Sequence, residues 1–275
     1  MRRALGLAVV VALWASSSSA QPGPNEQARG LLEDGRAYMK RGQAKQAVDN
    51  FNTIVSGFAG TDSVDDALLE IGRWQMDVEH NADQARAAFE DVTKRFPQSD
   101  GAPGAYYYLG RLALVRATTG AELDDALAQF VRVQRLYPGS EWVPRALHGC
   151  ALVHRKAGRL PDAVESARRV ALEYPNSEIA PEAYFEAGHA LALMGEPRAA
   201  MEELQQIRNR FPQSEWAPRA LERITTLYRL YGGAAPAFAL DPAYSLGAGD
   251  VLKDVRALLV TPDGQTWIAS DKVKG

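Results

Sequence analysis

The residue types that most often carry catalytic or metal chemistry are few in this 275-residue chain and are poorly spaced for it. It contains four histidines and one cysteine, and His148, Cys150 and His154 stand closest together. On a helix, a spacing of two residues turns Cys150 away from His148, and no two histidines show the i, i+4 spacing of a metal-binding helix. We therefore expect no catalytic residue, no metal ion, no cofactor and no enzymatic activity.

The arginines offer a different chemistry, the recognition of anions. Arg36, Arg73 and Arg111 each follow a glycine and recur at nearly equal spacing. Guanidinium groups bind carboxylates through paired hydrogen bonds, and apolar neighbours suit them to peptides. If these segments are stacked helices, the three arginines form a row along a concave groove that binds an acidic peptide or a free carboxylate. The predicted groove also contains Leu32, Leu69, Tyr107, Met39, Met76, His148, Arg155, Phe185 and His189.

An ordinary solvated helix surface is the alternative interpretation of these arginines. Glu33 and Glu70 stand three residues before Arg36 and Arg73, where local ion pairs would neutralise the guanidinium groups. Arg111 has no such acidic neighbour. Both interpretations stay open from the sequence.

A repeated phrase indicates which elements position these side chains. It consists of an aromatic residue, proline, a polar residue or glycine, serine and an acid, with a second proline a few positions later. The four copies are RFPQSDGAP at 95–103, LYPGSEWVP at 136–144, EYPNSEIAP at 173–181 and RFPQSEWAP at 210–218. A period of about 40 residues is typical of stacked repeat proteins, which build long binding surfaces.

Between the phrases, apolar and small residues recur at helical spacing in two blocks. The clearest unit contains Tyr184, Gly188 and Leu191, then Gly195, then Ala200, Leu204 and Ile207. This pattern predicts two antiparallel helices that approach closely at small residues, with the phrase proline ending the second helix. We expect the phrase serines to cap helix starts, and Trp142 and Trp216 to fasten adjacent repeats together.

These positions resemble tetratricopeptide repeats. In the first unit the resemblance is carried by Leu31, Gly35, Tyr38, Gly42, Ala47, Phe51 and Ile54. It implies an all-α fold over residues 25–233, a right-handed solenoid of about five helix pairs plus a capping helix around Leu221, Ile224 and Tyr228. It also implies a non-catalytic role in protein–protein interaction.

The aromatic-Pro-x-Ser-acid phrase is similar to the repeats of bacterial envelope proteins, namely the Tol-Pal-associated periplasmic protein and the repeat lipoprotein of the outer-membrane barrel-assembly machine. This resemblance implies a periplasmic scaffold that holds another envelope protein or a peptide, in outer-membrane or cell-wall maintenance.

The first twenty residues have the order of regions found in a secretory signal peptide. Arg2 and Arg3 precede an uncharged run at 4–14, and small residues lead to a cleavage site after Ala20. The run is too short to span a bilayer as a helix, so we expect no transmembrane segment after cleavage. Gln21 stands where a lipoprotein would carry cysteine. We expect a periplasmic or secreted protein.

Charge and cysteine content exclude two further classes. The formal net charge is −3, and loss of the two arginines of the signal peptide makes it more negative, which argues against nucleic-acid binding. A single cysteine cannot form an internal disulfide, so helix packing must stabilise the fold.

The composition changes after Gly232 and Gly233. Residues 234–250 are rich in Ala, Pro and Gly and indicate a linker. Residues 251–275 contain two β-rich runs around Thr261-Pro262-Asp263-Gly264, which predicts a β-hairpin resembling a blade edge of a β-propeller. The hairpin either packs on the solenoid or begins a truncated propeller. The second case gives an alternative function, in which the repeats are an accessory arm of a larger ligand-binding or enzymatic protein. A third interpretation is a cell-wall enzyme whose catalytic domain lies elsewhere.

Overall fold

The computed structural model describes residues 22–231, 255–260 and 266–270. The expected signal peptide at 1–20, the linker at 234–250 and the turn Thr261–Gly264 lie outside the described residues. The chain divides into two compact units, residues 1–227 and residues 228–275.

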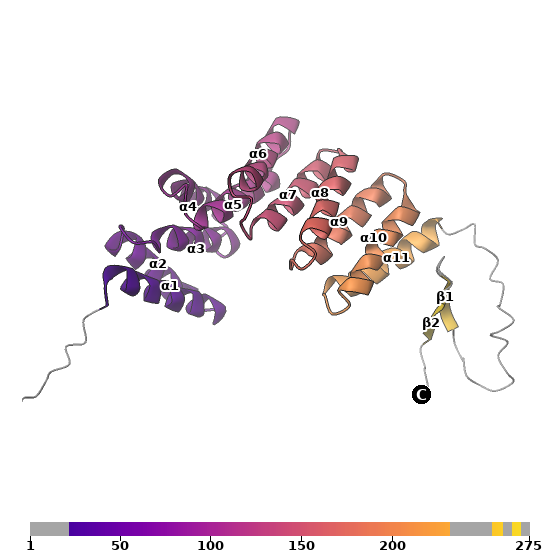
Figure 1. The fold of residues 1–275 in the computed structure, drawn as a ribbon, viewed down its shortest axis with the longest axis horizontal. Coiled ribbons are helices and arrows are strands. Elements are labelled where there is room, and N and C mark those ends of the chain that lie inside the picture. The colour runs from indigo at the N-terminus through magenta and orange to yellow at the C-terminus, as the bar shows by residue number, and fades with distance from the viewer. Residues whose placement is uncertain (1–21, 232–254, 261–265, 271–275) are drawn as a thin grey trace, which may run out of the picture. The chain divides into compact units, whose positions relative to one another are not determined.

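The described part of the first unit is built from helices. They are α1 (Pro24–Lys40), α2 (Ala44–Gly57), α3 (Val64–Asp77), α4 (Ala82–Arg95), α5 (Gly101–Arg116), α6 (Gly120–Leu136), α7 (Val143–Lys156), α8 (Leu160–Glu173), α9 (Ala180–Leu193), α10 (Pro197–Arg210) and α11 (Trp216–Tyr231). Helices α1 to α10 form five consecutive pairs, and each packs against the next along the chain (Figure 1). The first helices also contact one another, α3 with α5, α5 with α7, and α7 with α9. The predicted solenoid of five helix pairs with one further helix is confirmed.

Small residues on the first helix of each pair make room for large residues on the second helix. Phe51, Phe89 and Phe130 are fully buried. A Cβ atom added at Gly35 or Gly72 would lie 2.4 Å from the ring of Phe51 or Phe89. Because interiors are close-packed, the glycines set how closely the two helices approach. In the fifth pair, Leu204 takes the place of the phenylalanine. A Cβ atom added at Gly188 would lie 2.8 Å from its side chain.

Glycines follow three of the first helices because the turns inside those pairs need backbone angles that other residues rarely adopt. Gly42, Gly158 and Gly195 have φ angles of +74°, +74° and +79°, a region that L side chains rarely adopt. The connection of the third pair, residues 117–119, contains no such glycine and ends in a capping box instead. There the Thr119 hydroxyl accepts the Glu122 backbone N–H, while the Glu122 carboxylate accepts the Thr119 backbone N–H.

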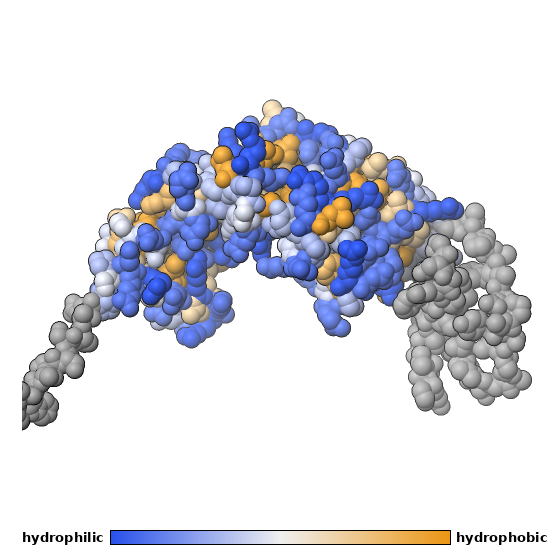
Figure 2. Space-filling model, viewed as in Figure 1, coloured by the Kyte–Doolittle hydropathy of each residue, from blue (hydrophilic) through white to orange (hydrophobic). Residues whose placement is uncertain are grey.

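The surface of the helical unit is mainly polar. Hydrophilic residues cover most of its visible face, with scattered apolar side chains between them (Figure 2). Among the described residues, no helix combines the length and the apolar character needed to cross a membrane.

Helix α11 closes the sequence of helices. Its buried residues Ala217, Ala220, Ile224 and Leu227 join the cluster formed by side chains of α9 and α10, such as Leu191 and Leu204. In the C-terminal part, strand β1 (Val255–Val260) pairs antiparallel with strand β2 (Thr266–Ser270). The β-propeller itself stays a prediction.

Candidate functional site

A groove opens where the connections between helix pairs meet the starts of the first helices. It encloses about 830 Å³, and we call it the junction groove. It is lined by Arg36 of α1; by Asp66, Leu69, Glu70 and Arg73 of α3; by Gln98, Ser99 and Asp100 of the α4–α5 connection with Pro103 of α5; and by Tyr137, Ser140, Glu141 and Trp142 of the α6–α7 connection. Both connections are copies of the repeated phrase. The repeat therefore builds this site as well as the fold.

Two of the predicted arginines lie in this groove and are held by one buried carboxylate. Arg36 Nε lies 3.0 Å from Glu70 Oε1, and Arg73 Nη1 lies 3.0 Å from Glu70 Oε2. Arg36 also lies 3.0 Å from Asp66. The Glu70 side chain is only 9% exposed, whereas the side chains of Arg36 and Arg73 are each 42% exposed, so a buried carboxylate holds two partly solvated arginines. Neither arginine remains an uncommitted cation.

The carboxylates that line the groove are less completely paired with cations than its arginines are with carboxylates. Burial raises the pKa of Asp66 above its usual value, and the neighbouring charges of Asp65 and Asp100 also raise it, although Arg36 opposes this. Asp100 and Glu141 are exposed, and within the described ranges neither forms an ion pair. In all, two arginines and four carboxylates line the groove.

The phrase serines form local turns, with one exception. The hydroxyl oxygens of Ser140, Ser177 and Ser214 each accept the backbone N–H of the residue two positions later, at 3.2, 3.3 and 3.1 Å. In the second pair's phrase, the corresponding N–H of Gly101 is donated to Asp65 of α3 instead, at 3.1 Å. The Ser99 hydroxyl is buried and has no hydrogen-bond partner in the described structure.

Trp142 forms the apolar part of the groove and joins two repeats. Its ring centroid lies 5.4 Å from that of Tyr107 and 5.5 Å from that of Tyr108, both on α5. Trp216 makes the equivalent contact with Phe185 of α9 at 5.1 Å. The prediction that both tryptophans fasten adjacent repeats is confirmed.

Two members of the predicted groove are buried in the helix packing. Leu32 and His148 are each 5% exposed. His148 lies on α7, whose close contacts with α5 and α9 enclose this position, and burial lowers its pKa to about 4. The structure thus corrects the expectation that Leu32 and His148 present their side chains to a ligand. Leu69 is equally buried, although it borders the junction groove.

Arg111 is the next arginine along the first helices. Its Cζ atom is 5.6 Å from the ring centroid of Tyr108, and Arg73 Cζ lies 5.9 Å from the same ring. Unlike Arg73, which pairs with Glu70, Arg111 forms no ion pair with the described residues. It borders a second, smaller cavity of about 280 Å³, together with Met76, Leu112 and Arg116. The three arginines thus follow one another along the first helices, but carboxylates hold Arg36 and Arg73, so they are not a row of free cations.

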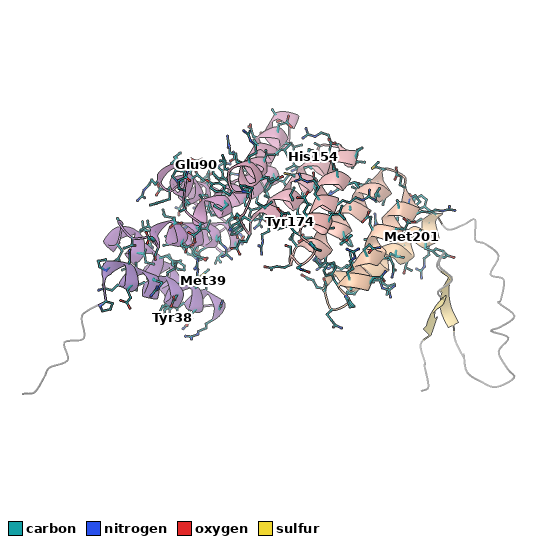
Figure 3. The ribbon with its side chains drawn as sticks, in the orientation of Figure 1. Tyr38, Met39, Glu90, His154, Tyr174 and Met201 are labelled. Carbon is teal, nitrogen blue, oxygen red and sulfur yellow. The ribbon has the colours of Figure 1, made fainter. Side chains whose placement is uncertain are left out.

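The remaining predicted residues are distributed along the first helices. Met39 lies on α1 and is partly buried (Figure 3). Arg155 of α7 forms an ion pair with the buried Glu186 of α9, which repeats the arrangement at Glu70. Phe185 packs on Trp216, and burial lowers the pKa of the half-buried His189.

The groups that could carry chemistry are unsuited to it. Burial raises the pKa of Cys150 to about 12, so its thiol stays protonated at neutral pH and is a poor nucleophile. Its sulfur accepts a hydrogen bond from the Gln134 side chain at 3.3 Å. In the part of the chain that the structure describes, no three metal-ligating side chains gather. The arrangement is suited to binding.

Sequence reasoning missed the acids Asp66, Asp100 and Glu141 and the hydroxyl of Ser99. The signal was present, because three of these residues belong to the repeated phrase or follow its serine directly. From the sequence, the phrase indicates only a helix boundary. Its place beside a groove depends on how repeats far apart in the sequence stack, which the phrase alone does not reveal.

Comparisons with known proteins agree with this architecture. The tetratricopeptide repeat family model matches residues 66–99 and 182–214, which contain most of α3–α4 and of α9–α10. No curated protein matches the chain.

Solved structures resemble the fold. A thermophilic tetratricopeptide repeat protein of Thermus thermophilus is 17% identical with a TM-score of 0.53, and the match covers 72% of this chain and 99% of that one. MamA of Desulfovibrio magneticus RS-1 is 14% identical with a TM-score of 0.52, covering 70% and 99%. The Cut9–Hcn1 structure of the APC/C gives 16% identity and a TM-score of 0.58, covering 73% of this chain and 36% of that one. At these identities the likeness concerns the fold alone.

Proposed function

We propose that this protein is a non-catalytic scaffold that binds a segment of another protein along its first helices. The observation that carries the proposal is the junction groove, about 830 Å³ of open space bordered by four successive first helices or the connections leading into them. Ligand sites commonly combine such a volume with an apolar surface and a few polar groups. Here Trp142 supplies most of the accessible apolar surface, because Leu69 and Pro103 border the groove but are buried.

The repeats support this class of function over catalysis. Stacked repeats build extended surfaces on which partners lie, and tetratricopeptide repeats generally serve as protein-interaction scaffolds. The groove is open and has charged walls, as expected for a site that takes a peptide segment.

We further propose that the protein is exported and holds an envelope protein or peptide in the periplasm, in outer-membrane or cell-wall maintenance. The order of charged, apolar and small residues in 1–20 supports export, and the repeated phrase supports the envelope. N-terminal sequencing of the protein from a periplasmic extract tests this, with Gln21 as the expected first residue. Full-length protein in the cytoplasmic fraction would refute it.

Site-specific photo-crosslinking in intact cells tests the scaffold function. A photoreactive residue is placed at Gln98, which is exposed and lines the junction groove. The control position is Glu165, which is exposed on the second helix α8. We expect a discrete crosslinked partner from position 98 and none from position 165. If position 98 and further positions along the first helices gave no crosslink, the scaffold function would be wrong.

A further inference from the structure

The acids of the repeated phrase fall into two groups. Glu178 lies 2.8 Å from Arg145, and Glu215 lies 3.5 Å from Arg219. The two other phrase acids, Asp100 and Glu141, form no ion pair within the described residues, and both line the junction groove. Two of the four phrase acids are therefore uncompensated, and both lie in the same groove.

The sequence explains this loss. Arg145 lies six residues before Ala151, which is the residue of α7 that corresponds to Gly72 in α3 and Gly110 in α5. It forms an ion pair with Glu178, the acid of the next phrase. At the same position in the two preceding first helices stand Asp66 and Gly104. Asp66 carries a charge of the same sign as Asp100, and burial, with smaller effects from Asp65 and Asp100, raises the pKa of Asp66. Gly104 leaves Glu141 without a cation.

Gly104 also shapes the groove. A Cβ atom at this position would lie 2.9 Å from Trp142 and 3.1 Å from Leu69, so a side chain here would collide with the apolar surface. An arginine would both neutralise Glu141 and fill this space. Its absence leaves Asp100 and Glu141 uncompensated beside Trp142, whose ring centroid already has Arg145 Cζ at 5.4 Å. The free carboxylates beside this apolar surface suit a cation with an apolar stem.

The Ser99 hydroxyl is an independent sign of an unfilled site. The three equivalent serines accept a backbone N–H, whereas the Ser99 oxygen is buried without a partner in the described structure, since Gly101 donates to Asp65. A buried polar group without a partner is costly, and it lies on the groove wall between Gln98 and Asp100. Because the oxygen has almost no exposed surface, a peptide N–H in the groove would satisfy it only after the Ser99 side chain turns toward the groove.

We propose that the junction groove binds a cationic segment of a partner protein, an extended stretch with lysine or arginine beside an apolar residue. The inference rests on the proposed scaffold function and specifies its partner. The carboxylates of Asp100 and Glu141 hold the cation, Trp142 contacts the apolar side chain, and the Ser99 hydroxyl, once turned into the groove, accepts a backbone N–H. Arg36 and Arg73 do not select anions, because Glu70 and Asp66 already hold them.

Peptide binding to the purified mature protein tests this inference. Three labelled ten-residue peptides share one sequence with a central tryptophan and differ only in flanking lysine, glutamate or glutamine. Fluorescence anisotropy gives their affinities at low and high salt. We expect the lysine peptide to bind most tightly, and salt to weaken it because exposed charges are screened.

Matched variants locate the binding. Asp100→Asn with Glu141→Gln removes two exposed carboxylates from the groove, and Glu165→Gln with Glu202→Gln removes two exposed carboxylates from second helices. We expect the first pair to weaken the lysine peptide by roughly tenfold, and the second pair to leave affinity unchanged. Circular dichroism confirms that both fold.

The outcomes separate this inference from the scaffold function. Equal affinity in the two variants, or tighter binding of the glutamate peptide with dependence on Arg111, would overturn the cationic segment and leave the scaffold standing. Absence of peptide binding together with a partner crosslinked at position 98 would also overturn only the inference. Absence of both peptide binding and any crosslink along the first helices would overturn both.

Discussion

The carboxylate of Asp65 on α3 accepts the backbone N–H of Gly101 on α5 at 3.1 Å, joining the second helix pair to the third. Both residues are buried, with Asp65 only 2% exposed. A Cβ atom at residue 101 would lie 2.6 Å from Asp65 Oδ2, so glycine permits this approach. The bond satisfies an N–H at the start of a helix that would otherwise lack a partner.

Asp65→Ala should therefore loosen the contact between these two pairs. It leaves the Gly101 N–H without its acceptor, which costs about 1–3 kcal/mol in the free energy of unfolding. Urea denaturation measures the change. Asp62→Ala, at an exposed position just before α3, is the control and should change stability little. Equal stabilities of the two variants would contradict the role given to Asp65.

Glu70→Gln tests the carboxylate that holds two arginines. The amide retains hydrogen bonding but removes the charge between Arg36 and Arg73, and we expect a loss of about 1–3 kcal/mol in the free energy of unfolding. Glu33 occupies the same position in the first repeat, but it is exposed and lies 4.0 Å from Arg29. Glu33→Gln should cost less than ~0.5 kcal/mol. The prediction is wrong if both variants unfold at the same urea concentration.

The repeat period was sufficient to predict the solenoid, because each helix pair depends mainly on local spacing and on its neighbours. The ion pairs were predictable only in part. The alternative interpretation paired Glu70 with Arg73, which the structure confirms at 3.0 Å. It also paired Glu33 with Arg36, but Glu33 lies beside Arg29, and Arg36 reaches Glu70 in the next repeat. Such partners depend on how successive first helices stack. The same stacking buries His148, which helical spacing alone would leave at the surface.

His148 should make stability depend on pH. Burial, with a smaller effect from the charge of Arg155, lowers the pKa of His148 from 6.5 to about 4. Between these values the unfolded chain binds a proton that the folded protein does not. Stability is therefore full above pH 6.5 and declines as the pH falls to about 4, by on the order of 3 kcal/mol.

The variant His148→Leu isolates this effect. It removes the titrating group and a buried Nε2 atom that has no hydrogen-bond partner among the described residues. Urea denaturation at several pH values between 4 and 7 should show a smaller decline for the variant than for the wild type. Other groups titrate in both proteins, so parallel pH profiles would show that His148 is not the source.

Helix α1 offers a matched pair of glycines with opposite expected effects. A Cβ atom at Gly35 would lie 2.4 Å from the fully buried ring of Phe51, whereas Gly30 has no neighbouring atom within 4 Å. Gly35→Ala should lower the free energy of unfolding by about 1–3 kcal/mol through overpacking. Gly30→Ala should raise it by up to ~1 kcal/mol, because alanine favours the helix.

A double variant separates steric conflict at Gly35 from a general effect of the substitution. Phe51→Leu shortens the side chain that the new Cβ atom would meet. Combined with Gly35→Ala, it should cost less than the sum of the two single changes, since the cavity and the extra methyl group compensate each other. Thermal and urea unfolding of the four proteins measures this coupling. Additive losses would mean that the glycine is required by the backbone of α1 and not by the ring of Phe51.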